Sequence, residues 1–233
     1  MGGIVAQRYF ENLEKGVSNP RLTKYRLPGG SDRDTAVNYL WNIELAEALY
    51  PGFAALEVTL RNSIHHALTT REGTDMWFRM LLEPGQLSVY AQTHLKLYNR
   101  LKRTEPTSGQ LVAELTFGFW TTLLSQPYHQ NLWAPNKTAL VKSVFPHLPP
   151  TPSNRHFVHQ RYNDLRILRN RVMHHEPIWY RPQLSQEWAE IIEAIGWVNP
   201  TVRDSILILD HFTDTYTNGK ARIDADLRQR FGL

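Results

Sequence analysis

Apolar residues recur at helical spacing along most of this chain, and strand-like alternation is nearly absent. The clearest repeat is in residues 51–70, where Leu56, Leu60, Ile64 and Leu68 follow one another at intervals of four. Residues four apart lie on one face of a helix, so this repeat predicts a helix with a core-facing stripe. We therefore expect an all-α fold.

The same apolar spacing, together with signals at the helix ends, predicts further helices. In chain order they cover residues 5–16, 34–50, 51–70, 86–103, 110–125, 137–145, 154–175, 183–195, 200–216 and part of 220–233. The segment 110–125 is the most apolar of them, and we expect it to be the central helix.

Capping and breaking residues set several of the expected boundaries. Ser31 or Asp32 can cap the helix 34–50. Pro51 should end that helix, because proline lacks the backbone N–H and its ring clashes with the preceding turn. Asn218 and Gly219 predict a turn near the end of the chain.

The expected organisation is one domain over residues 1–233. Within it, residues 1–30 form an irregular N-terminal segment apart from the helix 5–16, and residues 181–233 form a C-terminal helical extension. Six prolines lie between residues 126 and 153. They predict a long surface excursion inside the domain that holds only a short helix.

Composition narrows the class of protein without identifying it. With 233 residues and 42% hydrophobic side chains, the chain is expected to be globular. Its formal net charge of +4 is compatible with RNA binding and common among other proteins. The absence of cysteine excludes disulfides, thiolate nucleophiles and cysteine-based zinc sites. No secretory signal or membrane-spanning run is evident, so we expect a cytoplasmic protein with no membrane partner.

One charged residue stands out in the predicted helix 154–175. Its stripe consists of Val158, Tyr162, Leu165 and Val172, and Arg169 projects into the middle of this stripe. A charge at such a position is costly unless it finds a partner or a wet cleft. Arg169 is therefore expected to face an interior site or an interface.

Two further polar residues accompany this arginine. Asn170 and His174 are four residues apart and share a neighbouring face of the helix. Arginine binds phosphate bidentately, and histidine exchanges protons near neutral pH. Such a pair suits metal-free cleavage of RNA, in which the 2′-hydroxyl is the nucleophile and arginine stabilises charge on the phosphoryl oxygens.

These residues also carry a family resemblance. The string RNRVMH resembles the R-polar-x3-H signature of the HEPN superfamily, and LRNRVMHHEPI looks like the C-terminal signature of its Abi-like (abortive infection) branch. Other blocks resemble the same branch in the same order, at residues 39–68, 111–125 and 132–133. The resemblance spans roughly residues 33–180.

The resemblance implies a four- or five-helix HEPN bundle with additional helices. It implies a homodimer in which each protomer supplies Arg169 and His174 to one composite cleft. The implied activity is a metal-independent endoribonuclease that acts as a toxin in bacterial antiphage defence, without a cofactor. Its implied partners are RNA, a second copy of the chain, and an antitoxin or regulatory protein. In this scheme His174 moves protons, Arg169 holds the phosphate, and Asn170 orients His174 or the substrate.

Four other residues are candidates for supporting this site. Glu57 and Arg61 are four apart and either brace the site or form a structural ion pair, and we favour the ion pair. Glu114 is either a partly exposed helix residue or the counter-ion of Arg61 or Arg169. His175 could stack on substrate, substitute for its neighbour or have no role.

The basic residues of the same helix have two interpretations. Arg166 and Arg171 are candidates for binding RNA, and a solvated basic face is the alternative. His174, His175 and Glu176 are consecutive, so they fan out around a helix and cannot converge on a metal. We therefore expect no metal site.

Two rival hypotheses come from other functional classes. The first is a HEPN-type module that binds RNA or a nucleotide without cutting it, because a fold does not certify an activity. The second is a helical interaction protein in which Arg169 is a structural cation paired with Glu114.

Overall fold

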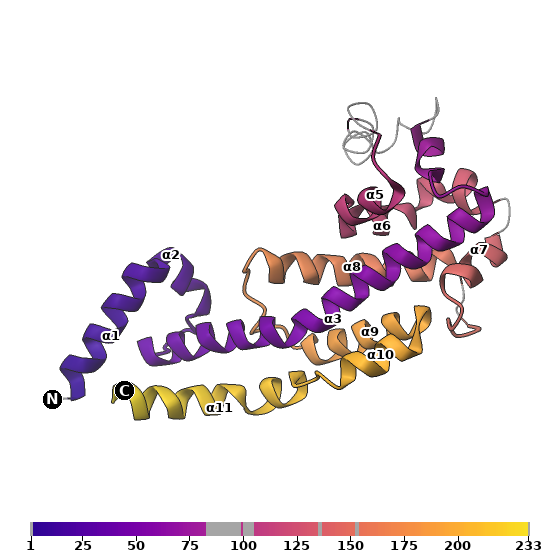
Figure 1. Cartoon of the computed structure of the whole chain (residues 1–233). Coiled ribbons are helices and arrows are strands. Elements are labelled where there is room, and N and C mark those ends of the chain that lie inside the picture. The colour runs from indigo at the N-terminus through magenta and orange to yellow at the C-terminus, as the bar shows by residue number, and fades with distance from the viewer. Residues whose placement is uncertain (1, 83–98, 100–104, 135–136, 152–153, 233) are drawn as a thin grey trace. The chain divides into compact units, whose positions relative to one another are not determined.

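The computed structural model describes residues 2–82, 99, 105–134, 137–151 and 154–232. Every regular element among these residues is helical, as Figure 1 shows. The all-α expectation is thereby confirmed for the described part of the chain. The predicted helix 86–103 lies almost wholly outside the described residues.

The helices differ in length and type. In chain order they are α1 (Gly2–Val17), α2 (Asn19–Leu22), the 3-10 turn η1 (Thr23–Tyr25), α3 (Asp32–Glu72), η2 (Trp77–Leu82), α5 (Ser108–Glu114), α6 (Phe117–Leu123), η3 (Gln126–Tyr128), the π-helical turn η4 (His129–Trp133), α7 (Lys137–Val144), α8 (Arg155–Met173), α9 (Leu184–Val198), α10 (Pro200–Leu207) and α11 (Phe212–Phe231).

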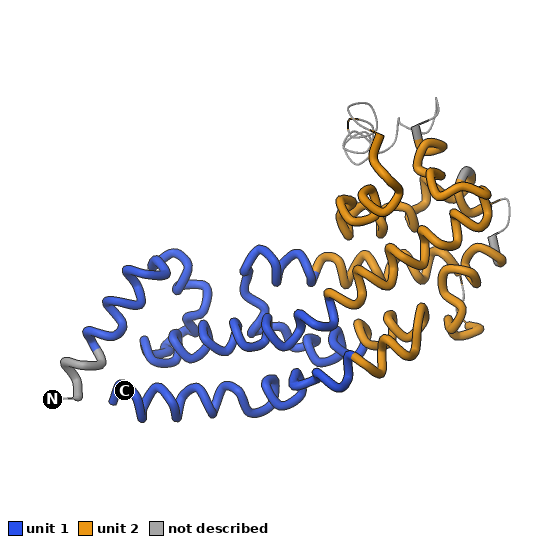
Figure 2. The backbone as a smooth tube through the Cα atoms, in the orientation of Figure 1, with its two compact units in different colours: residues 1–53, 168–189, 206–233 blue, residues 54–167, 190–205 orange. Residues whose placement is uncertain are grey.

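The chain divides into two compact units, coloured in Figure 2. Unit 1 comprises residues 1–53, 168–189 and 206–233, and unit 2 comprises residues 54–167 and 190–205. The boundaries fall inside α3, α8, α9 and α10, and neither unit is one continuous stretch of chain. The expected single domain stays a prediction. The N-terminal segment is more helical than expected, because α2 and η1 follow α1 before residue 30.

Helix α3 continues through Pro51, and the expectation that this proline ends a helix is wrong. An interior proline costs about 3 kcal/mol. Buried side chains on both sides of it, among them Leu49, Phe53 and Leu56, stabilise the continuous helix. Burial of each contributes roughly 1.5–3 kcal/mol, which is enough to offset the proline.

The start of α3 is capped as the sequence predicted. The Ser31 hydroxyl accepts a hydrogen bond from the Asp34 backbone N–H at 3.1 Å. The Asp34 carboxylate in turn accepts hydrogen bonds from the Ser31 backbone N–H at 2.9 Å and from its hydroxyl at 2.7 Å. This reciprocal arrangement satisfies two backbone donors at the helix start. The Ser31 hydroxyl, and then its backbone N–H, lower the pKa of Asp34.

In unit 2 the expected central helix 110–125 is two helices, α5 and α6. Leu115 and Thr116 adopt extended backbone angles between them, and the Thr116 hydroxyl caps α6 by accepting from the Phe119 N–H at 3.3 Å. Because the Thr116 hydroxyl caps a new helix at this point, one continuous helix does not form. The apolar composition of the segment did not indicate this break. The aromatic residues of this segment are buried, as expected, and Trp120 lies edge-on to Trp77, with ring centroids 6.3 Å apart.

The expected surface excursion at 126–153 contains part of the core. Tyr128, Leu132, Trp133 and Phe145 are buried. The Trp133 indole N–H donates to the Leu123 carbonyl at 2.7 Å. The described part of this segment therefore packs inward through several side chains and is not only a surface excursion. The short helix predicted at 137–145 is confirmed as α7.

In unit 1 the expected turn at Asn218 and Gly219 is wrong, since both residues lie inside α11. Gly219 is needed for helix packing. A Cβ atom there would lie 3.1 Å from Cδ1 of Trp41 and 3.1 Å from Oε2 of Glu44, both on α3. The helix expected over residues 200–216 instead stops at Leu207, and α11 begins at Phe212.

Polar contacts complete the packing of α11 on α3. The Trp41 indole N–H donates to the Thr215 carbonyl at 2.8 Å, and Arg222 Nη2 donates to Glu44 Oε2 at the same distance. The indole bond holds Trp41 in place over Gly219. A larger residue at 219 must therefore separate the two helices.

We expect Gly219→Val to lower the free energy of unfolding by about 1–3 kcal/mol, because its side chain overpacks the α3–α11 contact. Urea denaturation followed by circular dichroism measures this. Gly16→Ala is the matched control, since nothing lies within 4 Å of the added Cβ atom. It should leave stability unchanged or raise it by up to about 1 kcal/mol. Equal stability of wild type and Gly219→Val would contradict the packing argument.

The cap on α3 generates a second expectation. Because the folded pKa of Asp34 is depressed, its stabilisation is complete above the unfolded value of about 3.9 and is lost as the pH falls through the folded value. In an NMR titration, Ser31→Ala should move the Asp34 pKa upward, toward its ordinary value. Ser205→Ala, an exposed serine on α10, should not. An unchanged Asp34 titration in Ser31→Ala would refute the assigned cause.

Candidate functional site

Helix α8 presents the stripe that the sequence predicted. Val158, Tyr162, Leu165 and Val172 are all buried, and Arg169 is half-buried. The Tyr162 hydroxyl donates to the Ala194 carbonyl at 2.9 Å, which satisfies the one polar atom in the stripe. The helix is thus anchored by its apolar face, and Arg169 lies at the end of that face nearer the C-terminus.

Arg169 and Asn170 lie in the last turn and a half of α8, and His174 is the first residue after the helix. Nη1 of Arg169 donates to Oδ1 of Asn170 at 3.5 Å, a long hydrogen bond. The His174 backbone N–H donates to the Asn170 carbonyl at 2.9 Å. Asn170 is half-buried and the His174 side chain is exposed. The arrangement places an accessible imidazole one helical turn beyond a half-buried cation and amide.

Helix α8 stops at a left-handed residue that is not glycine. His175 has a φ of +56°, its N–H donates to the Val172 carbonyl at 3.0 Å, and the Glu176 N–H donates to the Arg171 carbonyl at 2.8 Å. These two bonds form a Schellman motif, whose left-handed position is usually occupied by glycine. A histidine there costs roughly 1–2 kcal/mol in backbone strain, so the surrounding contacts must hold it.

Arg21 of α2 supplies one of these contacts. Its Nη2 donates to the His175 carbonyl at 2.6 Å, across 154 residues of sequence. This guanidinium is part of the site that sequence reasoning missed. No local pattern identifies it, because Arg21 lies in a short polar segment far from α8 in the sequence.

Asn42 of α3 makes a second contact that holds the segment after α8. Sequence reasoning missed this residue too. Its side-chain oxygen accepts the backbone N–H groups of Ile178 and Trp179 at 2.6 and 3.1 Å. Asn38, one turn earlier on α3, donates to the Tyr25 carbonyl at 2.9 Å. The available signal was two asparagines four residues apart on the buried face of α3, since buried polar groups require partners.

Arg171 binds the segment that follows α8. Its guanidinium lies 3.4 Å from the Glu176 carboxylate and donates to the Pro177 carbonyl at 3.0 Å and to the Tyr180 hydroxyl at 3.1 Å. These contacts give Arg171 a structural role. Its predicted contact with RNA stays a prediction. Arg166 is half-buried and donates to the Asn163 side chain at 2.8 Å.

The other predicted supporting residues belong to unit 2, whereas Arg169 belongs to unit 1. Glu57 and Arg61 are half-buried, and Glu114 is exposed. Both interpretations of Glu114 stay predictions. The support that Glu57, Arg61 and Glu114 were expected to give the site stays a prediction.

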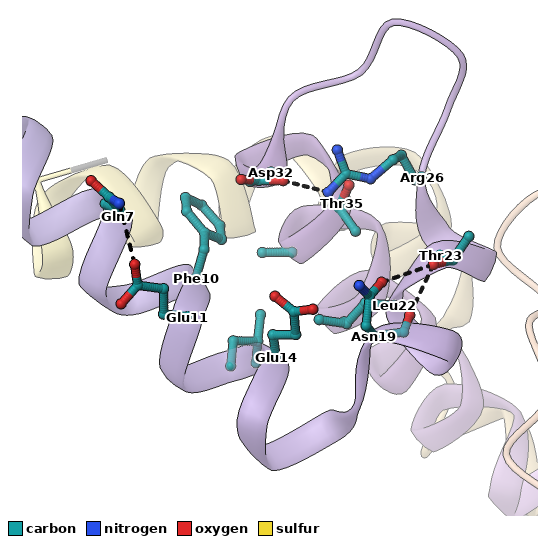
Figure 3. A pocket seen from close by; sticks show the side chains of 12 residues that line it. Gln7, Phe10, Glu11, Glu14, Asn19, Leu22, Thr23, Arg26, Asp32 and Thr35 are labelled. Carbon is teal, nitrogen blue, oxygen red and sulfur yellow. Dashed lines mark hydrogen bonds and ion pairs between the residues drawn. The ribbon is translucent and has the colours of Figure 1, made fainter.

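Unit 1 also contains a cavity of about 290 Å3, which is drawn in Figure 3. It is lined by α1, α2 and the start of α3, and contains none of the predicted site residues. Some of its polar groups bond to one another: Gln7 donates to Glu11 at 3.2 Å, and Arg26 pairs with Asp32.

Among the described residues, no group of three or more His, Asp or Glu side chains is arranged to hold a metal ion. Likewise, none of the helices in the described ranges is long and apolar enough to span a membrane.

Comparisons with family models, with curated proteins and with solved structures found no match. The HEPN resemblance therefore rests on the sequence motifs alone.

Asn42→Ala should remove the acceptor of two buried N–H groups and lower the free energy of unfolding by about 2 kcal/mol or more. Chemical denaturation of the purified protein measures the loss. Asn218→Ala is the matched control, because Asn218 is exposed on α11 and bonds only locally, to Asp214. It should change stability by less than about 0.5 kcal/mol. Equal effects of the two variants would refute the anchoring role of Asn42.

Proposed function

We propose that this protein is a metal-independent endoribonuclease of HEPN type, with Arg169, Asn170 and His174 as its catalytic residues. One observation carries the proposal. An exposed imidazole lies one helical turn beyond a half-buried arginine that donates a hydrogen bond to the neighbouring asparagine. All three residues lie between positions 169 and 174, at the C-terminal end of α8.

The chemistry follows from these three groups. The RNA 2′-hydroxyl attacks the adjacent phosphorus, the bond to the 5′-oxygen of the next nucleotide breaks, and a cyclic phosphate remains. His174 accepts the hydroxyl proton or donates a proton to the leaving oxygen. Arg169 neutralises charge on the non-bridging oxygens. Asn170 orients Arg169 through their hydrogen bond. DNA lacks the nucleophile and is not cut.

A homodimer completes this proposal. One imidazole cannot be acid and base in the same step, and a two-fold axis would bring a second His174 to the same phosphate.

The physiological role that we propose rests on the sequence resemblance. A cytoplasmic toxin that cleaves RNA during phage infection would arrest growth. It would require an antitoxin or regulatory partner to restrain it in healthy cells.

The test is cleavage of total RNA by the full-length protein in EDTA. Wild type should cut RNA and spare a matched single-stranded DNA. Arg169→Ala and His174→Ala should be slower by at least about 100-fold. His147→Ala, an exposed histidine outside α8, should retain wild-type activity.

Thermal melting separates a catalytic loss from unfolding. A folded but inactive Arg169→Ala variant supports the nuclease, whereas an unfolded one favours a structural cation. Wild-type protein that is folded and dimeric but cuts no RNA contradicts the proposal. Filter binding on that sample would then identify a non-cleaving RNA-binding module.

A further inference from the structure

A cavity of about 460 Å3 opens beside the C-terminal end of α8, entirely within unit 1. Its lining includes Arg21, Tyr25 and Tyr39, together with His175 and Glu176 from the segment that ends α8. Its volume falls within the range of small-molecule sites. His175 follows His174 in the chain, so the cavity lies next to the segment that carries the proposed catalytic histidine, and His174 itself does not line it.

The cavity has an unsatisfied polar wall. Tyr25 is fully buried, at 0% exposure, and its hydroxyl has no hydrogen-bond partner among the described residues. Burial raises the pKa of this hydroxyl, and the nearby Arg21 charge offsets the rise only in part. The hydroxyl is therefore protonated at neutral pH and can donate as well as accept. A buried donor of this kind requires a partner, and no residue in the described ranges supplies one.

Charged groups of both signs also line the cavity. A guanidinium has five N–H groups, and Arg21 donates one of them to the His175 carbonyl. The exposed carboxylate of Glu176 lies 3.4 Å from Arg171 Nη1, an ion pair that leaves it able to accept further hydrogen bonds. The cavity thus combines strong donors with a strong acceptor.

The remaining walls suit a flat ring. Tyr39 lies edge-on to Tyr25, with ring centroids 5.2 Å apart, and Val17, Ile43 and Val172 contribute apolar surface. Unstacked RNA bases are recognised by aromatic and apolar contact with their faces and hydrogen bonds to their edges. Among the bases, guanine presents O6 and N7 as acceptors for arginine and N–H donors for a carboxylate.

We propose that this cavity is a guanine-binding subsite that holds a nucleotide beside the scissile phosphate. The role of this subsite in catalysis rests on the proposed nuclease function. Binding of guanine itself needs only the cavity. The subsite would make the enzyme cut preferentially next to guanosine.

The test measures binding without cleavage. Guanosine 5′-monophosphate is titrated into the full-length protein and followed by NMR, with cytidine 5′-monophosphate as the competing base. Wild type should bind the guanosine nucleotide more tightly. Tyr25→Phe should weaken it about tenfold by removing one hydrogen bond. Ala46→Leu, which fills the cavity from α3, should abolish binding.

Matched controls exist on the same helix. Tyr50→Phe and Ala54→Leu alter exposed positions of α3 outside the cavity and should bind as wild type does. Tyr25→Phe should also melt no lower than wild type, because it removes an unsatisfied hydroxyl. A structural role for that hydroxyl would instead lower the melting temperature.

The outcomes separate the two proposals. RNA cleavage without guanosine binding, or binding that Tyr25→Phe and Ala46→Leu leave unchanged, overturns the subsite and spares the nuclease. Guanosine binding that both variants weaken, in a protein that cuts no RNA, supports the guanine site and overturns its catalytic role.

Discussion

The amide oxygen of Asn42 is the contact on which the geometry of the site depends. A helix C-terminus frays unless its following residues are held, and here one buried acceptor holds two consecutive N–H groups. Arg21 holds the same segment through the His175 carbonyl, and Arg171 ties it to its own helix. With the segment fixed, His174 has a defined position at the end of α8, and the cavity beside it keeps its walls.

This anchoring is a long-range property built from very few groups. Asn42 is 5% exposed and its bonds span more than 130 residues of sequence, as does the bond from Arg21. Losing either partner would leave buried polar groups without compensation, which costs more than an ordinary hydrogen bond contributes. The site is therefore sensitive to changes on α2 and α3 that touch neither Arg169 nor His174.

The sequence predicted features that depend on local pattern. The buried stripe of α8, the cap at Ser31 and the all-helical class all follow from spacing within a few residues. Expectations failed where packing outweighs a local signal: Pro51 lies inside α3, and Gly219 serves a close helix contact within α11. Arg21 and Asn42 could not be found at all, because their partners are distant in the chain and only the fold brings them together. Arg169, Asn170 and His174 could be proposed from the sequence because they are close together in the chain. The contacts that hold the segment after α8 could not, because they come from other helices.

The left-handed backbone of His175 has a consequence for how this protein can change. Glycine would relieve the strain at that position, so selection for stability alone would replace the histidine. The same replacement would remove an imidazole from the wall of the cavity and loosen the chain beside His174. At position 175, the residue that gives the higher thermal stability therefore differs from the residue that preserves the shape of the site. Selection for more stable variants would be expected to change the site at His175 first.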